Sequence, residues 1–298
     1  MKKIIITGIT GLIGKNISNK LLNKGYLVVG VTRNPEKAMK QLPGLTKCIK
    51  WNEEELTEEI NGAHAVIHLA GENVMARRWN EEHKSKILYS RVETTKKIVE
   101  VINSVSQKPQ VYIGASAIGY YGVQANQCDE NSNNGKDFLS EVVVKWENAS
   151  ESLIYGRRVL IRIGIVLDEN EGALSKMIVP FKFFVGGPIG SGDQPFPWIH
   201  IEDIANLFIF ALENDLNGIY NGVSPESVTL KQFSSELGNV MHRPSFMKVP
   251  EFIIKILYGE GADNVLKGVK INPKKTLESG FKFKFASLHN ALKMILNQ

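Results

Sequence analysis

The chain opens with Met1-Lys-Lys-Ile-Ile-Ile-Thr-Gly-Ile-Thr-Gly-Leu-Ile-Gly14, a short apolar run followed by three glycines, each three positions from the next. Ile4, Ile5 and Ile6 are β-branched and do not alternate with polar residues. This pattern predicts a strand that is buried on both faces of a parallel sheet. The glycines predict a tight turn after the strand, and the residues that follow predict the start of a helix.

Each glycine has its own physical role in such a turn. Gly8 allows a sharp turn, Gly11 allows the backbone to approach a pyrophosphate, and Gly14 allows the helix to lie against the strand. The helix N-terminus adds unpaired N–H groups and a partial positive charge. A glycine triplet alone also occurs in plain surface turns. Here Gly25 ends the helix and an apolar strand follows over 26–31. That order favours a pyrophosphate site, which would consist of Gly8, Thr10, Gly11, Leu12, Ile13 and Gly14.

Composition narrows the class of protein. A chain of 298 residues can bury one large core and add a smaller lobe. It contains no apolar run of about eighteen residues, so we expect no membrane span, and the early first strand leads us to expect no signal peptide. Cys48 and Cys128 lack metal-ligand spacing, so we expect no metal site and reduced thiols in a cytoplasmic protein.

The net charge of +5 fits a solvated basic face or attraction of an anionic ligand. Without a recognition motif it does not indicate nucleic acid.

The end of the second strand indicates which nicotinamide cofactor is bound. An acidic residue there commonly bonds the adenosine ribose, but this chain has Thr32-Arg33-Asn34. A guanidinium beside a hydroxyl suits a 2′-phosphate, both as a charge and as a planar donor fork. The sequence therefore predicts NADP(H) over NAD(H), with Arg33 as an ordinary surface residue of the loop as the alternative.

The fourth strand, 65–69, ends in small residues where the backbone must pass close to a dinucleotide. Leu69, Ala70, Gly71 and Glu72 are the cofactor-binding candidates there. His68 lies within the strand, where a structural role is more common than a catalytic one. Arg91 lies in a long helix predicted over 79–104, and either reaches the cofactor or substrate or pairs with a surface carboxylate.

The resemblance to a known family becomes specific at the fifth strand, 111–114, and the turn after it. The turn reads Ala115-Ser-Ala-Ile-Gly-Tyr-Tyr-Gly122, and a later segment reads Trp198-Ile-His-Ile-Glu-Asp203. With the glycine triplet and the His68-Leu-Ala-Gly71 exit, these motifs resemble the extended short-chain dehydrogenase/reductase superfamily, and within it the nucleoside-sugar-epimerase-like branch of SDR39U-type epimerase family proteins. The similarity runs essentially end to end. It implies that the nicotinamide lies near Ala115, Ser116 and Ala117.

The resemblance also implies a proton-transfer pair, a tyrosine with a lysine four positions later. A nearby ammonium lowers the pKa of a phenol from its ordinary value near 10 toward neutrality. When Glu147 is registered with the glutamate that commonly follows the pair, Leu139 and Val143 stand at the two catalytic positions. The same register puts Ala117 at the usual serine or threonine position, with Ser116 one place earlier.

Three groups could replace the pair. Tyr120 and Tyr121 lie at the strand exit, where either could donate a proton or simply pack at the turn. Glu141 and Lys145 lie four apart on a helix, the spacing of an ordinary surface ion pair. With Ser116, which lies one place before the usual serine or threonine position, the candidate catalytic residues are Tyr120, Tyr121 and Ser116.

The remaining chain predicts a second lobe. A sixth strand over 159–167 contains Arg162, which must be paired if it is buried. The segment 172–198 is predicted as a flexible substrate-side lobe with a loop-forming glycine run at 186–192, and its aromatic residues either form the core of the lobe or stack on a ligand. Asp203 is a candidate N-cap of a helix over 204–214.

Together these features predict an α/β fold, a Rossmann-type doubly wound parallel sheet with a smaller, discontinuous C-terminal substrate lobe. The cofactor domain would span 1–170 with 198–225 returning to it, and the lobe 171–197 and 226–298. The predicted function is an NADP(H)-binding oxidoreductase or epimerase-like enzyme acting on a small polar substrate. A nucleotide sugar is suggested by the resemblance alone, and a non-catalytic NADPH-binding or sensing protein is the alternative. Nothing in the sequence predicts an oligomeric partner.

Overall fold

The computed structural model describes residues 1–124 and 126–297, so the last residue of the predicted lobe, 298, lies outside the described chain. Its centre is a seven-stranded sheet in the order β3-β2-β1-β4-β5-β6-β9, in which every pair of neighbours is parallel. The strands of this sheet are β1 (Lys3–Thr7), β2 (Leu27–Val31), β3 (Lys47–Ile49), β4 (Ala65–His68), β5 (Val111–Ala117), β6 (Arg157–Ile163) and β9 (Gly218–Gly222). The predicted Rossmann-type fold class is confirmed.

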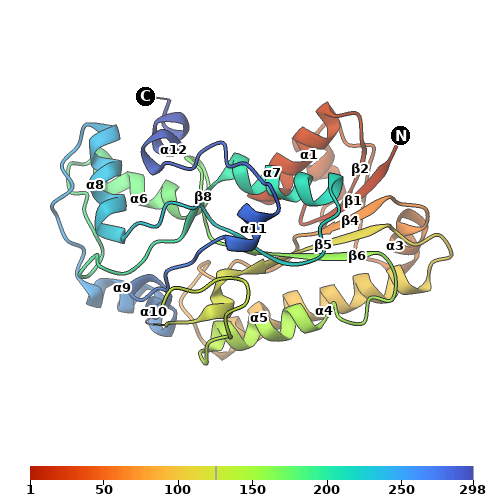
Figure 1. The fold of residues 1–298 in the computed structure, drawn as a ribbon, viewed down its shortest axis with the longest axis horizontal. Coiled ribbons are helices and arrows are strands. Elements are labelled where there is room, and N and C mark those ends of the chain that lie inside the picture. The colour runs from red at the N-terminus through yellow and green to blue at the C-terminus, as the bar shows by residue number, and fades with distance from the viewer. Residues whose placement is uncertain (125, 298) are drawn as a thin grey trace.

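Helices cover both faces of the sheet (Figure 1). Ile4 and Ile6 face α1 (Leu12–Asn23) and α7 (Ile201–Glu213) in one apolar cluster. Ile5 faces the opposite cluster, which includes residues of α3 (Glu53–Ile60) and α4 (Glu81–Ser104). The unalternated apolar pattern of β1 follows from this double burial. Further helices are α2 (Pro35–Gln41), which packs near β3, and α5 (Phe138–Asn148), which packs beside α4.

A smaller group of helices and strands lies beside the large sheet, at the left of Figure 1. Its apolar cluster includes Phe181, Phe196 and Trp198, all buried. The prediction that the aromatics form the core of the small lobe therefore holds for these side chains, whereas Phe183 and Phe184 are exposed. The elements of this part are β7 (Ile165–Leu167), β8 (Trp198–His200), α6 (Gly172–Lys182), α8 (Leu230–Met241), α9 (Glu251–Tyr258), α10 (Asp263–Leu266) and α12 (Leu288–Ile295). Helix α11 (Lys274–Glu278) packs against β9 of the large sheet. The domain limits drawn from the sequence stay a prediction.

The predicted sixth strand is two strands. The chain leaves the large sheet after Ile163, and Ile165–Leu167 pairs with β8 in a separate two-stranded sheet. The break falls at Gly164, where a Cβ would lie 2.6 Å from the carbonyl oxygen of Pro197. The backbone of the 197–198 segment therefore approaches too closely for any side chain, and the strand changes partner there.

The run 186–192 lies in a loop, as predicted, and helix α6 precedes it. One further local prediction was wrong. Helix α7 begins at Ile201, and its N-cap is His200, whose Nδ1 accepts a hydrogen bond from the Glu202 N–H. Asp203 lies inside the helix and is buried, where its carboxylate accepts hydrogen bonds from the backbone N–H groups of Lys284 (2.7 Å) and Phe285 (2.9 Å). Asp203 thus attaches the C-terminal segment to α7.

In the part of the chain that the structure describes, no helix combines the length and the apolar character needed to cross a bilayer. Cys48 and Cys128 are free thiols, and burial raises the pKa of each.

Replacing Asp203 with alanine should lower the free energy of unfolding by roughly 2–4 kcal/mol, because two buried N–H groups lose a charged acceptor. Asp203→Asn, which keeps one acceptor oxygen, should lose less. Urea denaturation of the three proteins measures the difference. A loss below about 0.5 kcal/mol for the alanine variant would show that the C-terminal segment is held by other contacts.

Candidate functional site

The glycine turn forms a compact cradle at the carboxyl end of β1. Gly8 has φ +67°, and the N–H of Gly11 donates to the carbonyl oxygen of Gly8 at 3.0 Å. A Cβ on Gly14 would lie 2.5 Å from that same oxygen, so only glycine lets α1 begin this close to the strand. Gly11 caps α1 without a side chain, and the first turn carries no acidic residue. The first N–H groups of α1 are therefore oriented to bind an anion.

The exit of β4 is held against this turn. Thr7 Oγ1 accepts hydrogen bonds from the N–H groups of Leu69 (3.1 Å) and Ala70 (3.2 Å), so its own proton points to His68 Nδ1 at 2.7 Å. His68 Nε2 lies 3.1 Å from Thr95 Oγ1. Burial lowers the pKa of His68 to about 3, which keeps the ring neutral at physiological pH. His68 is therefore a structural link between the sheet and the 69–72 segment, in agreement with the structural role preferred from the sequence.

Arg91 secures the same segment from α4. Its guanidinium donates to the carbonyl oxygens of Ile87 (3.0 Å) and Glu72 (2.9 Å), and the Glu72 N–H donates to Ser90 Oγ at 2.9 Å. A Cβ on Gly71 would lie 3.3 Å from Arg91 Cζ. Burial lowers the pKa of Arg91 to about 10, so it remains a cation at neutral pH. The hydrogen-bond partners of Arg91 are backbone carbonyls, and its Cζ lies 5.1 Å from the Trp146 ring centroid, an arrangement beside the two raised by the sequence.

The segment after β2 carries an available cation. Arg33 is exposed, whereas Asn34 caps α2 by accepting a hydrogen bond from the Lys37 N–H. Because β1 and β2 are parallel neighbours, Arg33 and the glycine turn follow the same edge of the sheet. A 2′-phosphate at this edge would meet Arg33 and the Thr32 hydroxyl.

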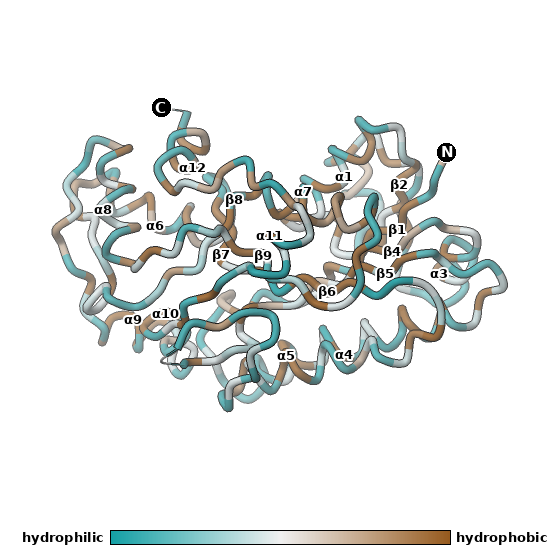
Figure 2. The backbone as a smooth tube through the Cα atoms, in the orientation of Figure 1, coloured by the Kyte–Doolittle hydropathy of each residue, from teal (hydrophilic) through white to brown (hydrophobic). Residues whose placement is uncertain are grey.

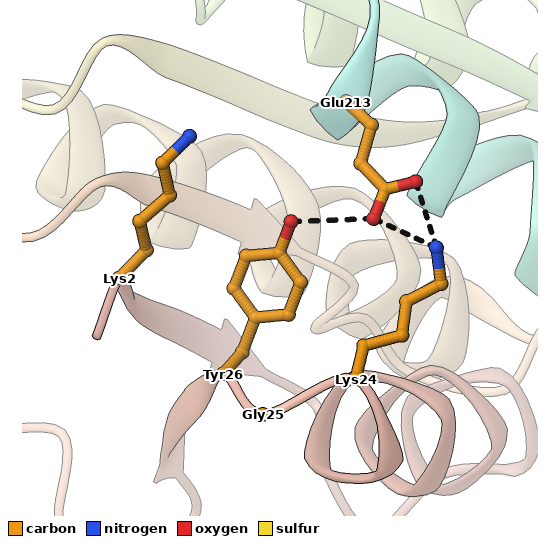
Figure 3. A pocket seen from close by; sticks show the side chains of 5 residues that line it. All are labelled: Lys2, Lys24, Gly25, Tyr26 and Glu213. Atoms are coloured by element: carbon orange, nitrogen blue, oxygen red, sulfur yellow. Dashed lines mark hydrogen bonds and ion pairs between the residues drawn. The ribbon is translucent and has the colours of Figure 1, made fainter.

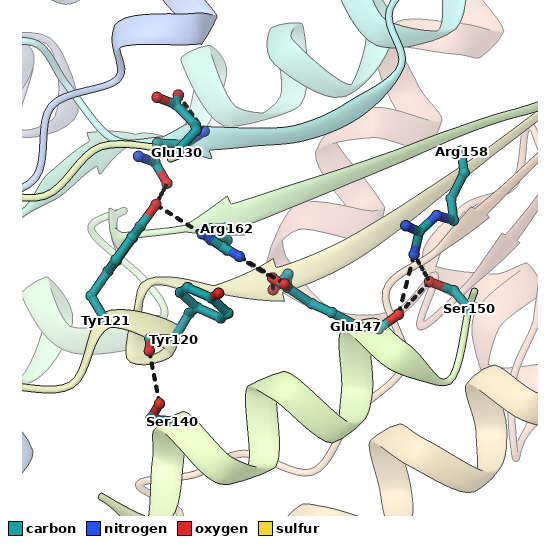
Figure 4. Close-up of polar contacts among 10 residues, drawn as sticks. Tyr120, Tyr121, Glu130, Ser140, Glu147, Ser150, Arg158 and Arg162 are labelled. Atoms are coloured by element: carbon teal, nitrogen blue, oxygen red, sulfur yellow. Dashed lines mark hydrogen bonds and ion pairs between the residues drawn. The ribbon is translucent and has the colours of Figure 1, made fainter. Parts of the chain in front are cut away.

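A buried ion pair lies beneath the turn that follows β5 (Figure 4). Arg162 Nε and Nη2 each donate to a Glu147 carboxylate oxygen at 2.8 Å, a bidentate pair between β6 and α5. Burial by itself lowers the pKa of Arg162, but the pairing with Glu147 outweighs it and raises the pKa above its ordinary value. The hydroxyl of Ser116 also donates to Glu147, at 2.5 Å. This carboxylate thus joins β5, β6 and α5.

The two tyrosines of the turn occupy different environments. Tyr121 is fully buried, its hydroxyl donates to Asn221 Oδ1 at 2.7 Å, and it accepts from Arg162 Nη1 at 3.1 Å. Burial raises the pKa of Tyr121 to about 12. Tyr120 is half-buried, and its ring centroid lies 3.3 Å from Arg162 Cζ. Figure 4 shows the Tyr120 ring beside the guanidinium, with the Tyr120 hydroxyl outside the hydrogen-bonded network.

The positions expected for the proton-transfer pair are filled by apolar packing. A Cβ on Gly119 would lie 3.3 Å from Leu139 Cβ and 3.8 Å from Val143 Cγ2, so both side chains pack against the turn. Glu141 and Lys145 are exposed on the same helix. Among the described residues, α5 therefore presents neither a phenol nor an ammonium to the strand exit.

A concavity of about 400 Å³ lies elsewhere, beside the amino ends of β1 and β2 (Figure 3). Its lining consists of Lys2, Gly25, Lys24, Tyr26 and Glu213, and the last of these binds both Lys24 and Tyr26. Glu213 accepts hydrogen bonds from Lys24 Nζ at 2.8 Å and from the Tyr26 hydroxyl at 3.2 Å. Because these groups already satisfy one another at the edge opposite the glycine turn, this concavity is not the site we assign to a cofactor.

Comparison with known proteins identifies relatives over the whole chain. The NAD dependent epimerase/dehydratase family matches residues 4–139, and a domain of unknown function, DUF1731, matches residues 249–295. The Arabidopsis thaliana protein named epimerase family protein SDR39U1 homolog, chloroplastic, is 40% identical over 98% of this chain and 86% of its own length. Human epimerase family protein SDR39U1 is 36% identical over 99% of both chains. The chain belongs to the SDR39U1 epimerase family.

Solved structures agree with this membership. A crystal structure of human SDR39U1 (isoform2) with NADPH matches with a TM-score of 0.91 and 36% identity over 99% of both chains. UDP-glucuronic acid 4-epimerase from Bacillus cereus, in complex with UDP-glucuronic acid and NAD, matches with a TM-score of 0.79 at 18% identity over 99% of this chain and 98% of its own. The latter similarity shows the fold alone. The family resemblance inferred from the sequence motifs is confirmed.

Several residues of this epimerase-family site were not singled out by the sequence. Thr7 and Thr95 flank His68, and their hydroxyl roles have no signature in a linear pattern. The sequence pattern of Glu147 indicates only the alignment of α5 with related proteins, although Arg162 in a buried strand already requires an acidic partner. Asn221 is buried beside Tyr121 from a strand one hundred residues later, and no local signal marks it.

Arg162→Met should lower the free energy of unfolding by about 3–5 kcal/mol, because Glu147 is left buried without its partner. The double variant Arg162→Met, Glu147→Leu should be less destabilised, since it removes both charges. Chemical denaturation of the wild type, both single variants and the double variant completes the thermodynamic cycle. If the double variant loses as much stability as the sum of the single ones, the pair is not energetically coupled.

Proposed function

We propose that this chain binds NADP(H) across the carboxyl edge of the sheet and acts as an oxidoreductase or epimerase-like enzyme. The observation that carries the proposal is the glycine cradle, in which a Cβ on Gly14 would lie 2.5 Å from the Gly8 carbonyl oxygen while the first N–H groups of α1 stay uncapped. Human SDR39U1, 36% identical, has a crystal structure with NADPH, which supports the choice of cofactor. When bound, NADP(H) would supply or accept a hydride at its nicotinamide.

The chain's own groups then have separate roles. The proposed pyrophosphate site consists of Gly8, Thr10, Gly11, Leu12, Ile13 and Gly14, and Thr32 and Arg33 are proposed to bind the 2′-phosphate. The 69–72 segment, fixed by Arg91, and the backbone of Ala115, Ser116 and Ala117 would border the rest of the cofactor. The cytoplasmic location stays a prediction, since one relative is named chloroplastic.

For proton transfer we favour Tyr120 over the other two candidates, with water as the alternative donor. The hydroxyls of Ser116 and Tyr121 are engaged by Glu147, Asn221 and Arg162, and the pKa of Tyr121 is raised to about 12 by burial. Ser116 and Tyr121 would then position the ion pair. Tyr120 is half-buried, its ring lies against the Arg162 guanidinium, and its hydroxyl lies outside the hydrogen-bonded network of the ion pair. The substrate would be a small polar molecule, with a nucleotide sugar suggested by kinship.

A second function has its own support. Leu139 and Val143 replace the tyrosine and lysine that the superfamily commonly uses, and both pack against Gly119. A protein that binds NADPH for sensing or for structure needs no proton donor at this position. The non-catalytic alternative therefore rests on the apolar face of α5.

Arg33→Ser should weaken NADPH binding roughly tenfold or more while leaving NADH binding almost unchanged, because a charge-assisted contact to the 2′-phosphate is lost. Isothermal titration with both cofactors measures this. Lys37→Ser, which removes an exposed cation one turn away, is the matched control. An equal loss for both cofactors would remove Arg33 from the 2′-phosphate site.

Tyr120→Phe should reduce NADPH-dependent turnover of a carbonyl or nucleotide-sugar substrate by roughly a hundredfold or more while NADPH affinity stays the same. Gly14→Ala serves as the cofactor-binding-deficient control. If the wild type binds NADPH but turns over nothing in a panel of such substrates, the sensing function is favoured. If Tyr120→Phe is as active as the wild type, water is the proton donor.

A further inference from the structure

Helix α9 leaves most of its apolar side chains in solvent. Within this helix, all of whose residues the structure describes, Ile254 is the one buried residue. Phe252, Ile256 and Leu257 are exposed by 61%, 63% and 55%, and Ile253 is exposed beside them. Figure 2 shows brown, hydrophobic backbone along α9 at the edge of the molecule. Spacings of four residues place 252 with 256 and 253 with 257 on one face of the helix.

Two segments near the start of α9 also expose apolar side chains. The N–H of Met247 donates to the Gly186 carbonyl oxygen at 3.1 Å, so the chain before α9 runs beside the chain after α6. Both segments carry exposed apolar side chains at this point. We call the α9 surface the set Phe183, Phe184, Val185, Phe246, Met247, Phe252, Ile253, Ile256 and Leu257. Apolar patches of this kind mark interaction sites on proteins.

Phe184 is held outside the core at a conformational disadvantage. It has φ +63°, at the end of α6 where glycine is usual, and the N–H of Val185 closes the turn on the Pro180 carbonyl oxygen at 3.0 Å. A bulky side chain is disfavoured in this left-handed region. The ring is nevertheless exposed and contacts the guanidinium of Arg243, 4.6 Å from its centroid. Burial of the Phe184 ring within the chain therefore does not offset the energetic cost of this backbone conformation.

The charges around the α9 surface are mostly of one sign. Segments 182–185 and 243–258 contain four basic side chains and one acidic one, Glu251. The basic ones are Lys182, Arg243, Lys248 and Lys255, and within the described residues none of them forms an ion pair. An apolar face with unpaired cations at its margin is complementary to a layer of anionic headgroups over hydrocarbon.

We propose that the α9 surface binds the surface of a bilayer that contains anionic lipids. The aromatic and aliphatic side chains enter the headgroup boundary, and the four cations contact lipid phosphates. A second copy of the chain fits less well, because a two-fold contact would set the four cations of one copy against those of the other. The surface lies partly in the region matched by the domain of unknown function, outside the proposed cofactor site.

Flotation of the full chain with phosphatidylcholine vesicles, with and without phosphatidylglycerol, tests this proposal. We expect binding that requires phosphatidylglycerol and weakens when salt is raised. The double variant Phe252→Ser, Ile256→Ser should bind roughly tenfold more weakly or worse. Ile154→Ser, at a side chain exposed by 72% outside the α9 surface, should bind like the wild type.

Phe184→Gly separates membrane binding from folding. Glycine relieves the left-handed backbone, so the melting temperature should stay the same or rise, while vesicle binding should fall. The proposal is overturned if the wild type does not float with phosphatidylglycerol vesicles, or if the variants of the α9 surface float as well as it does. Self-association in sedimentation velocity that these variants abolish, without vesicle binding, would identify a second copy as the occupant.

Discussion

The bidentate pair between Arg162 and Glu147 is the interaction on which the organisation of the site depends. Two charges in the interior are tolerated only when nearly every donor and acceptor is used, and here Ser116 and Tyr121 complete the set. The pair connects β6 to α5 and at the same time fixes the end of β5. Its position under Tyr120 places a permanent positive charge against the one phenol of the turn that is not fully buried.

A second constraint is the close approach of backbone segments at the carboxyl edge of the sheet, the proposed cofactor edge. A Cβ on Gly8 would lie 2.9 Å from the carbonyl carbon of Leu69, and a Cβ on Gly14 would lie 2.5 Å from the carbonyl oxygen of Gly8. At this junction Thr7 Oγ1 accepts hydrogen bonds from the N–H groups of Leu69 and Ala70 and donates to His68, and Arg91 donates to the carbonyl oxygen of Glu72. The segments that would surround a dinucleotide are therefore set in place by the protein itself, which is the preorganisation that binding favours.

The glycine turn and helix α5 differ in how far they match the pattern expected of related enzymes. The cofactor edge retains the full glycine pattern, while α5 presents Leu139 and Val143 where related enzymes are expected to have a proton-transfer pair. A proton donor for chemistry at this site would therefore come from the turn after β5, which carries Ser116, Tyr120 and Tyr121, or from water. The apolar α9 surface belongs to the C-terminal part of the chain, whereas the glycine turn is at its amino-terminal end.

Local patterns in the sequence were sufficient for the fold class, the glycine turn and the family, because strand burial and glycine spacing are short-range properties. They also showed that Arg162 needed a partner and that the usual tyrosine and lysine were missing. They did not predict the break at Gly164, because it comes from the backbone near Pro197, far along the chain. Nor did they predict that Asp203 would bind N–H groups at 284 and 285 instead of capping its own helix. The different environments of Tyr120 and Tyr121 were decided by tertiary structure as well, since residues adjacent in sequence diverge when only one of them meets Asn221, one hundred residues away.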